Sequence, residues 1–188
     1  MSNEFHQRLA VVTGASSGIG LAATERLLER GATVVAMARH LAGLDELASR
    51  FSATLHLLAG DVTQADDLSR LAQLTATLGP VDFLLPNAGI AQLADGLELA
   101  AFERQWAVNG AGALNTLRHL RHQLAPQASV VFIGTFLQQA TFPGLAAYIA
   151  SKAALRAQMR TLAVELAPHG IRLNMVSPGP TATPIWNT

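Results

Sequence analysis

The stretch Thr13-Gly14-Ala15-Ser16-Ser17-Gly18-Ile19-Gly20 stands between an apolar run and a helical pattern. The apolar run at residues 9–13 predicts a strand, and residues 18–30 predict a helix. Glycines allow a tight turn and a close approach of the backbone, and the free N–H groups of a helix N-terminus favour a pyrophosphate. The Gly-x-x-x-Gly-x-Gly spacing therefore predicts a dinucleotide site, with a plain glycine turn as the alternative.

The same alternation of strand and helix continues along the chain. Further strands are expected at residues 33–37, 54–59, 81–85, 129–133 and 171–176. Further helices are expected at residues 41–51, 64–78, 98–123 and 146–167. Such alternation predicts βαβ units with right-handed crossovers. The expected fold is α/β, a doubly wound parallel sheet of Rossmann type in three layers, forming a single domain over residues 1–188.

Composition excludes several classes of function. The 13 basic and 13 acidic residues cancel, so neither nucleic acid nor an anionic membrane is an expected partner. The chain has no cysteine, which excludes disulfides, thiolate nucleophiles and Cys-type zinc sites. His119 and His122 lack carboxylate partners at ligand spacing, so no metal site is expected and both are interpreted as surface residues. No signal peptide is visible, and a cytoplasmic protein is expected.

The end of the second predicted strand bears on the choice of cofactor. No carboxylate lies between Glu29 and Asp45, where an NAD site places an acid that holds the ribose hydroxyl. Arg39 follows this strand, and its guanidinium suits a 2′-phosphate. NADP(H) is therefore expected over NAD(H). An exposed surface arginine is the alternative.

The chain has one tyrosine, Tyr148, and one lysine, Lys152, four positions apart. Residues at i and i+4 share a helix face, so the ammonium can lie near the phenol. A phenol with a pKa near 10 needs such a charge to act as a base at neutral pH. The pair predicts proton transfer by Tyr148, with a packed tyrosine beside an exposed lysine as the alternative.

With the glycine turn, Asn87-Ala88-Gly89, Asn109 and Tyr148-Ile149-Ala150-Ser151-Lys152, the sequence from about residue 8 to 188 resembles the short-chain dehydrogenase/reductase family. The resemblance implies that Tyr148 is the general acid/base, that Lys152 assists it and that Asn109 completes a proton relay. It also implies that the side chain at position 135 binds the substrate oxygen. Thr135 stands where serine is usual, and its methyl group takes up space beside the reacting carbon.

The resemblance also implies a set of cofactor contacts. Asp61-Val62 would contact adenine, and the loop Pro178-Gly179-Pro180-Thr181-Ala182-Thr183 would orient the nicotinamide. The residues expected to bind the cofactor are Thr13, Gly14, Ser16, Ser17, Gly18, Ile19, Gly20, Arg39, Asp61, Val62, Asn87, Ala88, Gly89, Tyr148, Lys152, Pro178, Gly179, Thr181 and Thr183.

The expected function is NADP(H)-dependent reduction of a small-molecule carbonyl or oxidation of an alcohol. The alternatives are a noncatalytic dinucleotide-binding protein and a truncated product with little turnover. Members of the family normally continue through a substrate lid, another helix and a final strand, which this sequence is expected to lack. Low charge content and the alanines of the helix at residues 146–167 predict a homodimer or homotetramer.

Overall fold

The computed structural model describes residues 3–186, so the ends of the predicted domain, residues 1–2 and 187–188, lie outside the described part. Six parallel strands form one sheet in the order β3-β2-β1-β4-β5-β6. The strands are β1 (Leu9–Thr13), β2 (Thr33–Ala38), β3 (Leu55–Ala59), β4 (Val81–Pro86), β5 (Leu124–Ile133) and β6 (Arg172–Val176). This is the doubly wound order, so the predicted fold class is confirmed.

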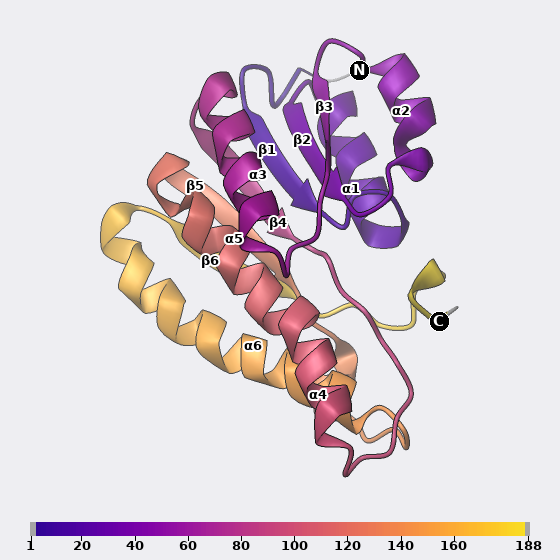
Figure 1. Ribbon diagram of the computed structural model, residues 1–188. Coiled ribbons are helices and arrows are strands. Elements are labelled where there is room, and N and C mark those ends of the chain that lie inside the picture. The colour runs from indigo at the N-terminus through magenta and orange to yellow at the C-terminus, as the bar shows by residue number, and fades with distance from the viewer. Residues whose placement is uncertain (1–2, 187–188) are drawn as a thin grey trace.

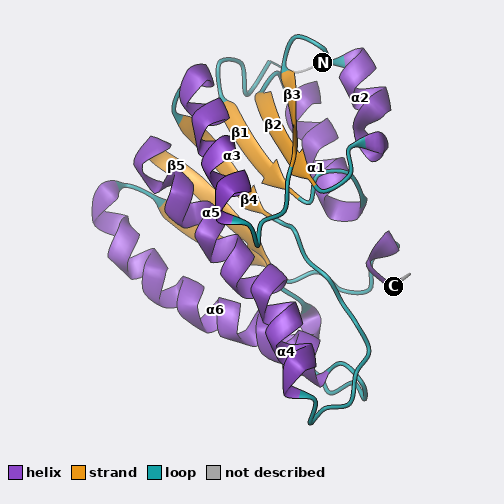
Figure 2. Ribbon diagram, in the orientation of Figure 1, coloured by secondary structure: helices purple, strands orange, loops and turns teal. Residues whose placement is uncertain are grey.

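Helices cover both faces of the sheet (Figures 1 and 2). They are α1 (Gly18–Glu29), α2 (Asp45–Arg50), α3 (Ala65–Leu78), α4 (Leu99–Trp106), α5 (Ala113–Leu120) and α6 (Ala146–Leu166). The helix expected at 98–123 is continuous but changes type, because the π-helical segment η2 (Ala107–Gly112) joins α4 to α5. The turn η4 (Phe136–Gln139) was not among the predicted helices.

Two apolar layers hold the helices to the sheet. On one face Leu71 of α3, Leu117 of α5 and Leu155 of α6 pack with strand residues such as Val130. On the other face Leu28 of α1 joins a second cluster with the alternate residues of β1 and β2. Successive side chains of a strand point to opposite faces, so strands covered on both sides are apolar at consecutive positions.

Strand β5 begins five residues before the predicted start. Leu124 already pairs with Val81 of β4, and the register then shifts before Ser129. Gln127 has a φ of 68°, in the left-handed region, and it follows Pro126. This irregular segment has the composition of a loop, which is why the sequence pattern placed it outside the strand.

The face that carries α1 and α2 is only partly covered beyond β1. Phe83 and Leu85 of β4 and Val131 of β5 are half-buried there. With Leu27 of α1 they line a shallow cavity of about 300 Å³. Among residues 3–186 no helix is long and apolar enough to cross a membrane.

Candidate active site

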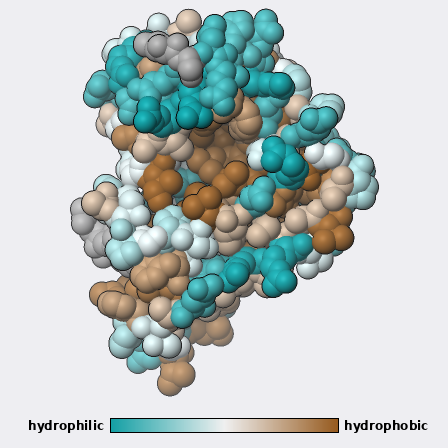
Figure 3. All heavy atoms as spheres, turned by 180° about the vertical axis from the view of Figure 1, so that it is seen from behind, coloured by the Kyte–Doolittle hydropathy of each residue, from teal (hydrophilic) through white to brown (hydrophobic). Residues whose placement is uncertain are grey.

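A cavity of about 770 Å³ lies at the carboxyl ends of β1 and β4. These strands are neighbours in the sheet, but their following helices lie on opposite faces, so the loops that leave them part and open a crevice. Crevices at such a switch point are where doubly wound folds bind ligands. Seen from behind, the molecule is hollowed near its middle, and hydrophobic side chains gather there (Figure 3).

The glycine turn forms one wall of this cavity. Gly14 and Gly18 have φ values of +65° and +53°, which L side chains rarely adopt. A Cβ added to Gly20 would lie 2.5 Å from Asn87 Nδ2 and closer still to the Gly14 oxygen. The glycines at 14, 18 and 20 are therefore required by the backbone path that the turn takes.

Helix α1 begins at Gly18 with Ser17 as its N-cap, and the cap makes no side-chain hydrogen bond to the first turn. The first N–H groups of a helix have no partner within the helix, and they attract anions. Ser16, Ser17 and Ile19 line the cavity at this end. This geometry fits the pyrophosphate of a dinucleotide.

Arg39 and Asp61 lie at the carboxyl end of the sheet, in the loops after β2 and β3. Arg39 is exposed, and both residues line the cavity with the buried Val62. Asp61 Oδ1 accepts hydrogen bonds of 2.8 Å from the N–H and the hydroxyl of Thr63. The turn after β3 is therefore fixed by the aspartate that was predicted to contact adenine.

Asn87 joins the turn after β4 to the glycine turn. Its Nδ2 donates to the carbonyl oxygens of Thr13 and Gly14 at 3.0 and 3.1 Å. Thr13 Oγ1 accepts from the Ala88 N–H at 3.2 Å. Thr13 is buried and, like Gly20, does not line the cavity, whereas Asn87, Ala88 and Gly89 do. Thr13 and Gly20 thus shape the wall from behind it.

The loop after β6 closes the cavity from the opposite side. Pro178, Gly179, Thr181 and Thr183 line it, as the sequence predicted for a nicotinamide loop. A Cβ on Gly18 would lie 3.0 Å from Thr183 Cβ, so the loop reaches back to the glycine turn.

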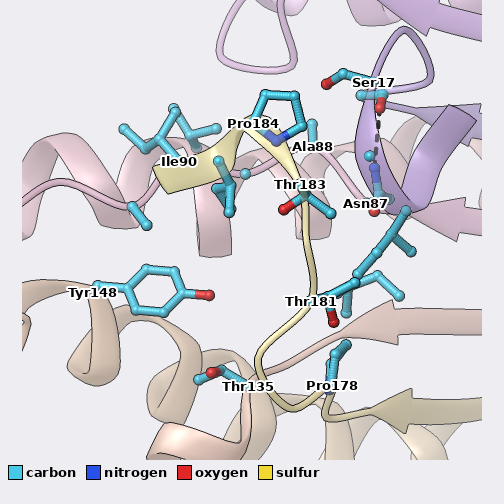
Figure 4. Close-up of a pocket in the computed structure, with 18 of the residues that line it drawn as sticks. Ser17, Asn87, Ala88, Ile90, Thr135, Tyr148, Pro178, Thr181, Thr183 and Pro184 are labelled. Carbon is cyan, nitrogen blue, oxygen red and sulfur yellow. Dashed lines mark hydrogen bonds between the residues drawn. The ribbon is translucent and has the colours of Figure 1, made fainter. Parts of the chain in front are cut away.

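Tyr148 comes from the first turn of α6, and its hydroxyl points into the cavity (Figure 4). The ring is buried, and burial raises the pKa of the phenol, while a hydrogen bond with the Thr135 side chain lowers it. The sequence predicted that the nearby ammonium would favour the phenolate, but burial is the dominant effect in this structure.

Lys152 lies one helical turn farther along α6 and is 4% exposed. Its Nζ donates to the Ile133 carbonyl oxygen at 2.8 Å. Burial lowers the pKa of this ammonium to about 8. An exposed lysine, the alternative interpretation of the sequence, is therefore wrong.

Asn109 occupies η2 and is completely buried. Its Oδ1 accepts from the Ile90 N–H at 2.8 Å, and its Nδ2 donates to the Ile90 oxygen at 2.9 Å and to Ser151 Oγ at 3.0 Å. The asparagine does not line the cavity. It connects the loop after β4 to α6, and a π-turn is a frequent feature of functional sites.

Two supporting residues were missed by the sequence interpretation. Ser151 is buried, and its hydroxyl donates to the Tyr148 carbonyl oxygen at 2.7 Å. Gln105, also buried, exchanges two hydrogen bonds with the backbone of Gln92. A polar residue on the buried face of a predicted helix was the available signal in both cases.

The sequence predicted that His119 and His122 are surface residues and form no metal site. His122 is exposed as predicted, but His119 is half-buried, with Nδ1 2.8 Å from the Asn115 oxygen. Among residues 3–186 no three His, Cys, Asp or Glu side chains are grouped closely enough to hold a metal ion.

Comparison with known proteins adds to this geometry. Residues 8–188 match the short chain dehydrogenase family. A glycine betaine reductase of Emericella nidulans is 36% identical over 94% of this chain, which spans only 14% of that protein. A glucose 1-dehydrogenase of Gluconobacter oxydans is 35% identical over 97% of this chain and 73% of its own length. A 3-ketoacyl-(acyl-carrier-protein) reductase from Brucella melitensis, solved with NADH, has a TM-score of 0.89 at 28% identity, covering 98% of this chain and 80% of that one.

Proposed function

The chain belongs to the short chain dehydrogenase family, and on that basis we propose that it is an oxidoreductase that interconverts a carbonyl compound and a secondary alcohol. The observation that carries the proposal is the grouping of Tyr148, Thr135 and Lys152 around one cavity that the glycine turn also lines. When bound, a nicotinamide cofactor supplies or accepts the hydride. The protein supplies the proton and holds the carbonyl oxygen.

Tyr148 is the proposed proton donor and acceptor. Its raised pKa keeps the proton on the phenol at neutral pH, so the side chain is ready to protonate the oxygen of a carbonyl under reduction. Thr135 carries a hydroxyl that hydrogen-bonds Tyr148 and can bind the same oxygen. Both side chains therefore converge on one substrate atom.

Lys152 is proposed to assist Tyr148 by its charge and to reach the ribose hydroxyls of the cofactor. Gly89 lies between the two buried polar residues of this region, because a Cβ there would lie 3.1 Å from Asn109 Oδ1 and 3.5 Å from Lys152 Nζ. The relay proposed from the resemblance runs through Lys152, water and Asn109. The proximity of Gly89 to both residues supports that route.

We propose NADP(H) as the preferred cofactor, because Arg39 is an exposed cation that lines the cavity after β2. A guanidinium binds a 2′-phosphate with two hydrogen bonds, whereas NAD(H) offers no charge there. KM for NADPH is expected to be at least about tenfold below KM for NADH, the factor that ~1.4 kcal/mol provides. Equal values, or a lower KM for NADH, would remove Arg39 from the cofactor site.

The activity is tested with a panel of ketones, aldehydes and quinones. NADPH oxidation is followed by its absorbance at about 340 nm. We expect oxidation that depends on both protein and substrate. A second function, dinucleotide binding without turnover, is favoured by one observation, the threonine at position 135 beside Tyr148, whose extra methyl group takes up space next to the reacting carbon. NADPH that binds with micromolar affinity but is oxidised by no member of the panel would support this second function.

We also propose a homodimer or homotetramer formed through α6. Ala146, Ala150, Ala153 and Ala157 recur at helical spacing on its exposed face, where small side chains let another helix approach closely. Light scattering at micromolar concentration is expected to give twice or four times the chain mass. A monomer would contradict this assembly. The single-domain organisation and the cytoplasmic location stay predictions of the sequence.

A further inference from the structure

The cavity has two chemically different ends. The end formed by the glycine turn and the loops after β2 and β3 carries polar and charged side chains, among them Ser17, Arg39 and Asp61. The other end, beside Tyr148, lies away from Ser17 and Asn87 in Figure 4. Its lining residues come from the loop after β4, from η4, from the loop before α6 and from η6 (Pro184–Trp186).

This second end is apolar. Tyr148 belongs to a buried cluster with Ala91, Leu137 and Leu145, against which Ile185 packs. The polar groups here are the hydroxyls of Tyr148 and Thr135 and, one helical turn from Tyr148, the buried ammonium of Lys152. The side chains that line this end from the loop after β4, from η4 and from the loop before α6 are all apolar: Ile90, Ala91, Leu93, Phe136, Leu137, Phe142 and Leu145.

Exposed hydrophobic side chains continue this surface to the mouth of the cavity. Leu93 is 74% exposed, Phe142 is 55% exposed and Phe136 is 41% exposed. All three line the cavity. We call Leu93, Phe136, Leu137, Phe142 and Leu145 the apolar wall.

The loops that carry the wall are joined by hydrogen bonds. The Ala94 N–H donates to the Gly144 oxygen at 2.9 Å, which joins the loop after β4 to the loop before α6. Within the second of these loops the Leu145 N–H donates to the Phe142 oxygen at 3.2 Å. A Cβ on Gly144 would lie 3.1 Å from Leu93 Cδ2, so the two loops are in direct contact. The wall is therefore held together before any ligand binds.

We propose that the substrate is a ketone or aldehyde with a hydrocarbon chain, which lies on the apolar wall while its carbonyl oxygen meets Tyr148 and Thr135. This inference rests on the proposed function and adds a substrate class to it. A hydroxyl or carboxylate placed against the wall would lose its hydrogen bonds to water and find no polar partner among the five side chains of the wall. Polyols, sugars and keto acids are thus expected to be poor substrates.

The test compares matched carbonyl compounds with the wild-type protein. From 2-butanone to 2-hexanone, kcat/KM is expected to rise about 15-fold, because each of the two added methylenes buried from water contributes roughly a factor of four. Hydroxyacetone, which matches 2-butanone in size, and 5-oxohexanoate, which is 2-hexanone with a terminal carboxylate, are each expected to fall at least about tenfold below their partners. Equal or higher kcat/KM for the two polar compounds would overturn the proposal.

Variants locate the effect in the wall. Phe142→Ser and Leu93→Ser change exposed side chains and are expected to reduce the 2-hexanone to 2-butanone ratio by about fourfold each, the effect of roughly one lost methylene contact. Leu97→Ser is the matched control, since Leu97 is 96% exposed on the same loop as Leu93 but does not line the cavity. A ratio unchanged in both wall variants, or changed equally in the control, would contradict the assignment.

A binding experiment separates this inference from the proposed function. Saturation-transfer NMR with 2-octanone and 7-oxooctanoate needs no turnover. If no compound is reduced but 2-octanone binds selectively and Phe142→Ser weakens it, the proposed function is wrong and the apolar wall is right. If 7-oxooctanoate binds as well as 2-octanone, the apolar wall is wrong whether or not turnover is seen.

Discussion

Lys152 is the residue whose surroundings most change its chemistry. The ammonium has one hydrogen bond to a backbone oxygen and is 4% exposed, so its charge is poorly solvated. Burial disfavours the charged form of a lysine and thereby lowers its pKa. Residues 123–151 contain no Asp, Glu, Lys or Arg, so the sequence itself indicates that Lys152, which follows directly, is poorly solvated. It could not indicate that the Ile133 oxygen would be the partner.

The lowered pKa of Lys152 makes stability depend on pH. Below about pH 8 the ammonium is charged in the folded and unfolded states, and the full cost of burial is present. Between about 8 and 10.5 only the unfolded chain keeps the proton, so the free energy of unfolding rises with pH, by about 3 kcal/mol in total. Urea unfolding between about pH 7.5 and 9.5 is expected to show about 2 kcal/mol of this rise.

Lys152→Met is the control for that measurement. The variant has no ammonium, so its free energy of unfolding is expected to lack this part of the pH dependence. The same slope in the wild type and in Lys152→Met would show that another group causes it.

Thr135 tests how far a threonine replaces the serine usual in the family. Thr135→Ser keeps the hydroxyl and removes the methyl group, so turnover is expected to be equal or higher. Thr135→Ala removes a donor to the substrate oxygen, and kcat is expected to fall about 10²-fold or more. It also removes the hydrogen bond that lowers the pKa of Tyr148. Steady-state kinetics with unchanged kcat in Thr135→Ala would exclude Thr135 from the mechanism.

Among the elements, the helix from α4 through η2 to α5 has the least predictable feature. The sequence predicts one helix, but the π-helical turn at Asn109 depends on contacts with Ile90 and Ser151, which are 19 and 42 residues away. Local periodicity carries no information about such contacts. By contrast, the glycine turn follows from local sequence, because its residues, its strand and its helix are adjacent in the chain.

Loss of the Asn109 side chain should loosen the contact between the loop after β4 and α6. Asn109→Ala leaves the Ile90 N–H and oxygen without this partner, and the free energy of unfolding is expected to fall by about 2 kcal/mol or more. Gln158→Ala, at an exposed position of α6, is the control and should change it by less than about 0.5 kcal/mol. Chemical denaturation of the two variants measures the difference. A loss no larger in Asn109→Ala than in Gln158→Ala would contradict the positioning role.

In the whole molecule, strand order decides where the site lies. The loops after β1, β3, β4 and β6 meet at one edge of the sheet, although up to about 165 residues separate them, because all six strands are parallel. The alternation of strands and helices was enough to predict this edge. It did not predict the apolar wall, since the wall combines short segments whose placement depends on loop contacts such as Ala94 with Gly144.

In the proposed reaction Tyr148 is the group that transfers the proton. Its most direct test is the Tyr148→Phe variant, which keeps the ring and removes the hydroxyl. NADPH affinity, measured by fluorescence titration, serves as the control that the cofactor site is intact. With a substrate found in the panel, kcat is expected to fall at least about 10²-fold with little change in NADPH affinity. Wild-type kcat in Tyr148→Phe would contradict the proposed role of Tyr148 in proton transfer.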